Sequence, residues 1–230
     1  MKTTTRILLA FALAACSHDP PPKVTPAPTA TASASASASA SASASAPCVP
    51  SASVAANDGL PKTWERTPDI EFVPTPQNVV DKMLEVANIQ KTDVLYDLGC
   101  GDGRIPVTAS KTFGIKTIGF DLDPQRVRES RASVAKNCLE NLVTIELKDV
   151  FKVDLRPATV VTLYLLPELN VKLIPQLEKL APGSRIVTHD FDMKGVEPEK
   201  TWTVTAPDHR PPFKDRAHYV YLFKIPLKKK

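Results

Sequence analysis

The sequence predicts an α/β fold with a mostly parallel seven-stranded sheet, helices on both faces and an antiparallel C-terminal strand. Three observations support this prediction. Residues 93–98 form a short apolar, strand-like segment that runs into a turn with a glycine at every second position. Four further strand-like segments follow, most of them separated by helical patterns, which is typical of parallel βαβ units. The last two apolar segments, 202–205 and 218–224, alternate with period two and suit an antiparallel pair.

The glycine-rich turn reads Asp-Leu-Gly-Cys-Gly-Asp-Gly-Arg from Asp97 to Arg104. Glycine allows positive φ angles and lets a ligand approach the main chain closely. The first N–H groups of the helix that follows attract an anionic group. The turn does not match a dinucleotide fingerprint, which requires glycine at Arg104, nor a P-loop, which requires Gly-Lys-Ser/Thr. We therefore expect a small-molecule pocket at the carboxyl end of this strand.

Residues 1–16 show the pattern of a secretory signal. Lys2 and Arg6 precede an apolar run over 7–15 that is too short to span a bilayer as a helix. The run ends in Leu-Ala-Ala-Cys at Cys16, which resembles the lipobox of bacterial lipoproteins. This resemblance implies that Cys16 is lipidated and anchors the protein to a membrane, on the periplasmic or cell-surface side. An ordinary cleaved signal is the alternative.

Residues 17–58 are rich in proline, alanine and serine and lack apolar periodicity, so we expect a disordered tether. The remaining residues, 59–230, suit one domain with one core. The net charge of +4 leaves this domain weakly basic with mixed signs, so we expect no nucleic-acid partner. Cys48, Cys100 and Cys138 show no spacing typical of a metal site or a disulfide, and we expect neither.

The domain is expected to begin with a helix that precedes the strand and the glycine turn. Thr75, followed by proline, predicts a hydroxyl cap for a helix that extends to about residue 88. The alternative is that Thr75 lines the pocket. After the glycine turn, a second helix is expected over 104–113, closed by Gly114.

Carboxylates follow the next two strands. The segment 116–120 predicts a strand that ends at Asp121, where an ionised carboxylate can accept hydrogen bonds from both hydroxyls of a ribose. A helix is expected over 124–137. A third strand over 143–147 precedes Asp149, which by itself is consistent with a simple turn former.

Two more strands complete the predicted parallel part of the sheet. The segment 159–163 is apolar and β-branched, as expected of a central strand covered on both faces. Tyr164 and a helix expected over 168–180 follow this strand. The fifth strand is expected over 185–188.

The Asp-x-Gly-x-Gly-x-Gly turn, with Asp121 and Asp149 at matching distances, resembles the cofactor site of class I S-adenosylmethionine (SAM)-dependent methyltransferases. The resemblance covers about residues 74–225 and implies a Rossmann-like methyltransferase fold that binds SAM. It also implies that Asp121 holds the ribose hydroxyls, that Asp149 accepts from the adenine amino group, and that the Val150 N–H meets a ring nitrogen. The implied cofactor-binding residues are Asp97, Gly99, Cys100, Gly101, Gly103, Asp121, Leu122, Asp149 and Val150.

A narrower resemblance is to a bacterial branch near small protein-lysine methyltransferases. It rests on Thr-Pro at 75–76, Val-Val-Asp-Lys-Met-Leu at 79–84, Tyr-Asp-Leu-Gly at 96–99, Gly-Asp-Gly-Arg-Ile at 101–105, Asp-Val-Phe at 149–151 and Asp-Leu at 154–155. This resemblance implies SAM binding and leaves the methyl acceptor open between a protein lysine and a small molecule. The Asp/Asn-Pro-Pro-Tyr/Phe signature of enzymes that methylate amino groups of nucleic acids is missing.

Methyl transfer from a sulfonium requires an acceptor lone pair held in line with the S–CH₃ bond, in a site largely cleared of water. No metal is required. Tyr164, Glu168 and Asn170 follow the fourth strand and are candidate acceptor-site residues, with Tyr164 and Glu168 as the catalytic candidates. The alternative for Tyr164 is an aromatic that packs at the rim. His189 and Asp190 are either an acid/base pair or, as for most histidines at strand ends, structural.

Three functional hypotheses follow. The first is an active SAM-dependent methyltransferase, and the second is a membrane-tethered, non-catalytic module that binds SAM or a related nucleoside. The third is a cytoplasmic enzyme with a misassigned start, which needs an alternative start codon because no methionine lies between Met1 and Met83. Export favours the module, since SAM is made in the cytoplasm, whereas the complete set of pocket residues favours the enzyme. The oligomeric state stays open.

Overall fold

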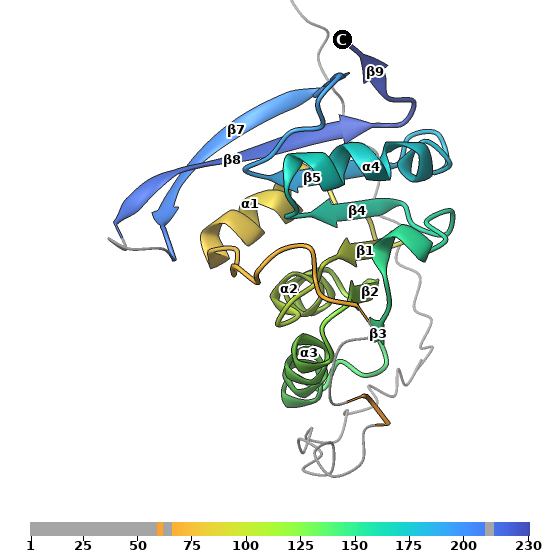
Figure 1. Cartoon of the computed structure of the whole chain (residues 1–230), viewed down its shortest axis with the longest axis vertical. Helices are drawn as coiled ribbons and strands as arrows, with labels where there is room; N and C mark the ends of the chain where they lie inside the picture. Colours follow the sequence, from red (N-terminus) through yellow and green to blue (C-terminus); the bar gives the residue numbers. More distant parts are fainter. Residues whose placement is uncertain (1–58, 62–65, 210–213) are drawn as a thin grey trace, which may run out of the picture. The chain divides into compact units, whose positions relative to one another are not determined.

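The computed structural model describes residues 59–61, 66–209 and 214–230 (Figure 1). The signal peptide predicted over 1–16, its lipidation site Cys16 and the tether predicted over 17–58 lie outside the described residues. Within the described part of the chain, none of the helices has the length and apolar character needed to cross a membrane.

The described residues contain a seven-stranded sheet in the order β3-β2-β1-β4-β5-β8-β7. Strands β1 to β5 are parallel, and β8 runs antiparallel to both β5 and β7. The predicted fold class is therefore confirmed. Because the strand order reverses between β1 and β4, a crevice forms at the carboxyl ends of these two strands. The strands are β1 (Val94–Leu98), β2 (Lys116–Asp121), β3 (Val143–Leu147), β4 (Val160–Leu163), β5 (Arg185–His189), β7 (Lys200–Pro207) and β8 (Asp215–Lys224).

Helices cover both faces of the sheet. α1, α2 and α3 pack on one face, while α4 and the short 3₁₀ helix η1 pack on the other. Two short strands, β6 and β9, form a separate two-stranded sheet that the sequence did not predict. The bounds are α1 (Gln77–Val86), α2 (Arg104–Phe113), α3 (Pro124–Lys136), η1 (Val150–Lys152), α4 (Pro167–Leu177), β6 (Val196–Glu197) and β9 (Lys228–Lys229).

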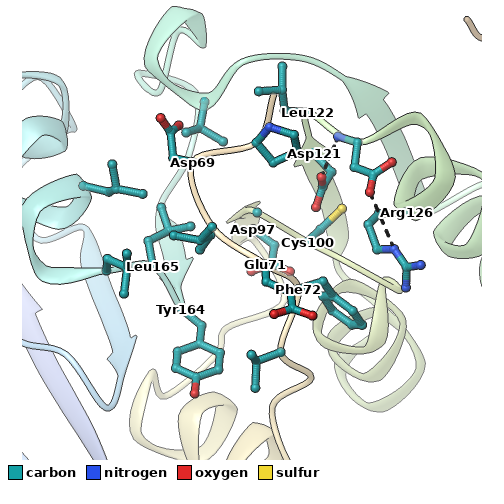
Figure 2. A pocket seen from close by; sticks show the side chains of 18 of the residues that line it. Asp69, Glu71, Phe72, Asp97, Cys100, Asp121, Leu122, Arg126, Tyr164 and Leu165 are labelled. Carbon is teal, nitrogen blue, oxygen red and sulfur yellow. Dashed lines mark hydrogen bonds and ion pairs between the residues drawn. The ribbon is translucent and has the colours of Figure 1, made fainter. Parts of the chain in front are cut away.

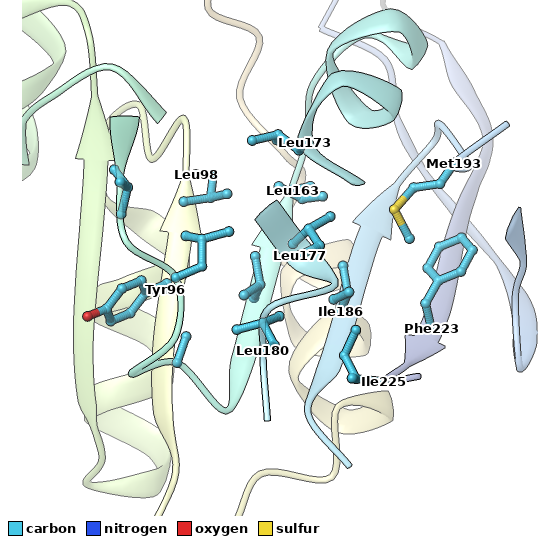
Figure 3. Close-up of a cluster of buried hydrophobic side chains, with 14 of the residues drawn as sticks. Tyr96, Leu98, Leu163, Leu173, Leu177, Leu180, Ile186, Met193, Phe223 and Ile225 are labelled. Atoms are coloured by element: carbon cyan, nitrogen blue, oxygen red, sulfur yellow. The ribbon is translucent and has the colours of Figure 1, made fainter. Parts of the chain in front are cut away.

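The central strands bury side chains on both faces. Leu98 and Leu163 pack with Leu173 of α4 on one face, as Figure 3 shows. Leu95 and Val160 of the same strands pack beneath α1 and α2 on the other face. Successive residues of a strand point to opposite faces, so a strand covered on both sides must be apolar throughout. Full burial of each such side chain stabilises the fold by about 1.5–3 kcal/mol, which holds the strand ends in place.

Helix ends follow the predictions with two exceptions. α2 ends at Phe113 with Gly114 in the left-handed region, as predicted. The expected hydroxyl cap of α1 is wrong: Pro76 is its N-cap, and the Thr75 hydroxyl instead lies 3.1 Å from Nδ1 of His189. The helix predicted over 168–180 ends earlier, at Leu177. In the first case, a buried polar partner more than one hundred residues away competes successfully with a local cap.

The prediction that the cysteines form no disulfide is wrong for Cys138. Cys138 is disulfide-bonded. Cys100 is buried and free. Spacing along the chain did not indicate this bond, because a disulfide depends on the distance between two Cα atoms in space rather than on their separation in sequence.

Candidate active site

One cavity of about 880 Å³ lies at the carboxyl ends of the central strands (Figure 2). Asp97 of β1, Asp121 of β2 and Asp149 after β3 all line it, so the structure brings the three predicted carboxylates together. Predicted residues that also line it are Gly99, Cys100, Leu122, Val150 and Tyr164.

The glycine turn forms the floor of this cavity. Gly101 and Gly103 do not line the cavity, but both have positive φ, +55° and +78°. A Cβ atom at Gly101 would lie 2.2 Å from Cε2 of Phe72, and one at Gly103 would lie 2.2 Å from Oγ of Ser130. Any larger residue would therefore be strained and would also displace packed neighbours. These two glycines therefore determine the conformation of the turn, and their neighbours form the surface of the cavity.

Asp97 is a buried carboxylate with one unused oxygen. Its side chain accepts a hydrogen bond of 2.7 Å from the Thr162 hydroxyl at Oδ1, while Oδ2 has no hydrogen-bond partner. Burial is the main cause that raises the pKa of the Asp97 carboxyl to about 7. The hydrogen bond from Thr162 opposes this rise, and the Asp121 and Asp102 carboxylates add to it. An unsatisfied buried carboxylate in a cavity fits a cationic or hydrogen-bond-donating ligand group.

Asp121 is held in place by backbone N–H groups. Its Oδ2 accepts from Gly101 N–H at 2.8 Å, and its Oδ1 accepts from Asp123 N–H at 2.9 Å. Burial raises the pKa of this carboxyl, although these hydrogen bonds lower it in part. Each carboxylate oxygen has two acceptor sites, so both oxygens keep capacity for a ligand's hydroxyl groups. The Gly101 amide thus connects the glycine turn to the end of β2.

Asp149 makes the local contact of a turn former and also lines the cavity. It caps η1 by accepting from the Phe151 N–H at 3.0 Å. Its other oxygen, Oδ2, lies 3.6 Å from the Arg66 guanidinium. The hydrogen bond from Phe151 thus fixes the Asp149 carboxylate, which is partly exposed to the cavity.

Sequence reasoning missed the segment 66–73, all of which lines the cavity. Phe72 covers Gly101, and the Arg126 guanidinium lies 4.9 Å from the centre of the Phe72 ring. Figure 2 shows the side chains of Asp69, Glu71 and Phe72 among those that line the cavity. The segment has no helical or strand periodicity, so the only available signal was its position directly before Thr75.

The predicted acceptor-site residues separate in the structure. Tyr164 lines the cavity, whereas Glu168 is exposed in the first turn of α4 and does not line it. Asn170 is buried and donates to the carbonyl oxygens of Phe191 and Asp192, at 3.2 and 3.3 Å. The geometry therefore supports Tyr164 alone among the three as a residue that meets a ligand.

His189 is buried and held on both ring nitrogens. Nδ1 lies 3.1 Å from the Thr75 hydroxyl, and Nε2 lies 2.9 Å from Nδ1 of His218. Burial lowers the pKa of His189 to about 3, so the ring stays neutral and does not serve as an acid at neutral pH. These contacts favour the structural interpretation of His189. Thr75 and Asp190 do line the cavity, which confirms the alternative that the sequence left open for Thr75.

Among the described residues, one cluster has the composition of a metal site: His189, Asp190 and His218, whose ligand atoms lie within 4.8 Å of one another. The ligand atoms that face one another already have partners, whereas Nε2 of His218 has none in the described part of the chain. The Arg216 guanidinium pairs with the Asp190 carboxylate, and the two imidazoles face each other. A fixed guanidinium beside the carboxylate repels a second cation, so this donor set favours a hydrogen-bonded network over a metal ion.

The charge of the cavity favours a cationic ligand. Its lining contains twice as many carboxylates as arginines, and an excess of one sign concentrates ligands of the opposite sign. The carboxylates are Asp69, Glu71, Asp97, Asp102, Asp121, Asp123, Asp149 and Asp190, and the arginines are Arg66, Arg104, Arg126 and Arg216.

Comparison with known proteins agrees with this geometry. Residues 97–200 match the family model of the ANTKMT methyltransferase domain. A protein-lysine N-methyltransferase from Saccharolobus islandicus is 41% identical over 160 residues, which cover 69% of this chain and 95% of that protein. The chain belongs to the class I SAM-dependent methyltransferases.

Two further relatives of this methyltransferase have different described acceptors. A lysine N-methyltransferase from Rattus norvegicus, named for its action on an ATP synthase protein, is 28% identical over 145 residues, or 61% of this chain and 60% of that protein. A crystal structure of an RNA methyltransferase from Salinibacter ruber in complex with S-adenosyl-L-homocysteine (SAH) has a TM-score of 0.59 and 44% identity. That comparison covers 67% of this chain and 94% of the other.

SAM is therefore the cofactor of this methyltransferase, and when bound it supplies the methyl group as a sulfonium. The cavity fits it: Asp121 and Asp149 offer acceptors for hydroxyl and amino groups, and the unpaired Oδ2 of Asp97 suits a cationic ligand. The individual contacts of the nine predicted residues with the cofactor stay predictions.

Proposed function

We propose that this methyltransferase acts on the ε-amino group of a lysine in a protein. The observation that carries the proposal is the charge of the cavity, whose carboxylates outnumber its arginines two to one. An acidic site attracts a cationic lysine side chain and repels the phosphates of RNA. The two relatives described as lysine methyltransferases support the same acceptor.

The chemistry requires a neutral amine in a desolvated site. The lysine nitrogen uses its lone pair to form the new N–C bond while the S–CH₃ bond breaks, and the sulfur keeps the bonding electrons. Before this step the cationic lysine loses one proton to water, and after it the methylated nitrogen carries the positive charge as an ammonium. The contribution of the protein is to orient the amine and exclude water, which the apolar rings of Tyr164 and Phe191 in the cavity lining suit.

RNA is the second candidate acceptor, because the relative described as an RNA methyltransferase is 44% identical. One experiment separates the candidates: the full-length protein is incubated with tritiated-methyl SAM and either total protein extract, total RNA or a mixture of small amines. Acid hydrolysis of labelled protein should yield methyl-lysine. Label in RNA with none in protein would replace lysine by RNA as the acceptor, and an Asp97→Asn protein controls for background transfer.

We further propose that the protein is an exported, membrane-anchored lipoprotein. The signal pattern over 1–16 supports this, and so does the disulfide at Cys138, because disulfides persist mainly in oxidising compartments. Labelling of cells with a radioactive fatty acid should mark the wild-type protein and not a Cys16→Ser variant. Equal labelling of both would rule out lipidation at Cys16. A labelled protein that binds SAH but transfers no methyl group would instead support the non-catalytic module.

A further inference from the structure

Asp190, directly after β5, has a backbone conformation that residues with a Cβ atom rarely adopt. Its φ is +58°. Its N–H donates to the Tyr219 carbonyl at 2.7 Å, and its Oδ1 accepts from the Tyr219 N–H at 3.1 Å. Two hydrogen bonds to β8 thus hold this unfavourable conformation at the rim of the cavity. Such outliers concentrate at functional sites, where the surrounding structure maintains them.

The second oxygen of Asp190, Oδ2, faces two groups that line the cavity. The Arg216 guanidinium donates to it, and the Tyr164 hydroxyl lies 3.4 Å away. The Arg216 contact is among the causes that lower the pKa of Asp190, which keeps the carboxylate ionised. The distance to Tyr164 is longer than an ideal O–H···O bond, as is common for catalytic contacts without ligands.

The ring of Tyr164 lies near two other rings. Its centre lies 3.9 Å from the centre of the His189 ring and 6.2 Å from that of Phe191. The Tyr164 hydroxyl lies beside the Asp190 carboxylate. Figure 2 shows Tyr164 at one end of the cavity, away from Asp121 and Leu122.

We propose that Asp190 is a positioning residue that acts through Tyr164, and that these two residues form the port where the lysine amine enters. This inference rests on the proposed lysine acceptor. A phenol that donates its proton to a carboxylate becomes a better acceptor for an N–H group. The Tyr164 oxygen then holds one N–H of the neutral amine, which directs the nitrogen lone pair away from the phenol and toward the interior of the cavity.

Two conservative substitutions isolate this effect. Asparagine tolerates the left-handed region better than most residues, so Asp190→Asn should keep the backbone and its acceptor for the Tyr219 N–H. It removes the charge and the second acceptor oxygen. Tyr164→Phe removes only the hydroxyl. Tyr96→Phe is the matched control. Tyr96 is buried in the same hydrophobic cluster as Leu98 and Leu173 and does not line the cavity.

The experiment measures kcat and KM of the full-length protein on a pool of peptides that each contain one lysine, and SAH affinity by calorimetry. Each single variant should lower kcat/KM by about 10- to 100-fold, as expected for loss of a hydrogen bond to a charged group. SAH affinity should stay within about twofold, and the double variant should be no worse than the worse single variant. Tyr96→Phe should match the wild type.

Different results would overturn different parts. If the losses of the two single variants multiply in the double variant, Asp190 does not act through Tyr164. If the wild type methylates the peptides and both variants equal it, the port is refuted while the lysine acceptor stands. If the wild type methylates RNA or small amines but no lysine peptide, the proposed function fails, and the lysine port fails with it.

Discussion

Ionisation of Asp97 should couple cofactor binding to pH. Burial raises the pKa of this carboxyl from 3.8 to about 7, so in the free protein Asp97 carries a proton at pH 6. A cationic ligand favours the ionised form. Binding of SAM at pH 6 should therefore release close to one proton, and SAM affinity should fall about tenfold for each pH unit below 7. Above about pH 8, the contribution of Asp97 should be constant.

The raised pKa of Asp97 also makes folding stability depend on pH. Lower pH favours the folded state, whereas higher pH favours SAM binding. The folded state keeps the Asp97 proton up to about pH 7, whereas the unfolded chain loses it near pH 3.8. Stability is therefore lost as the pH rises between these values, by about 4 kcal/mol in total at 1.36 kcal/mol per pKa unit. An Asp97→Asn variant avoids this cost. It should melt several degrees higher than the wild type at pH 8 in the absence of ligand, yet bind SAM more weakly.

Calorimetric titration with SAM in two buffers of different ionisation enthalpy measures the proton release directly. The cofactor's own amino group titrates in both proteins, so the difference between wild type and Asp97→Asn isolates the contribution of Asp97. Equal proton release by both proteins, or an unchanged wild-type affinity between pH 6 and 8, would refute a protonated Asp97 in the free site.

Three further predictions concern the walls of the cavity. Asp121→Ala should weaken SAM binding by about 1–3 kcal/mol, because it strands the Gly101 N–H and removes the proposed ribose acceptor; unchanged affinity in calorimetry would exclude Asp121 from the site. Gly103→Ala should destabilise the domain by about 1–3 kcal/mol in thermal unfolding, since its Cβ would lie 2.2 Å from Ser130 at a φ of +78°. Phe72→Ala should weaken SAH binding by about tenfold with little change in melting temperature, and a large loss of stability instead would assign Phe72 to the core.

The sequence by itself determined the α/β class, the extent of most strands and the ligand end of the sheet. Apolar runs that alternate with helical patterns can bury their side chains only in a parallel sheet. Parallel strands end at one edge, so carboxylates placed directly after successive strands must meet there. For this reason Asp97, Asp121 and Asp149, which lie far apart in the chain, could be assigned to one site before the structure was known.

Only the tertiary structure decided what closes that site. Residues 66–73 show no helical or strand periodicity, and Arg216 lies on β8, whose pairing between β5 and β7 places its guanidinium beside Asp190. The partner of the Thr75 hydroxyl and the disulfide at Cys138 were likewise hidden. Such contacts join segments that have no local relation, and their energies depend on distances that exist only once the sheet has formed. Local patterns therefore located the carboxylates at the strand ends, and long-range packing decided which residues close the cavity around them.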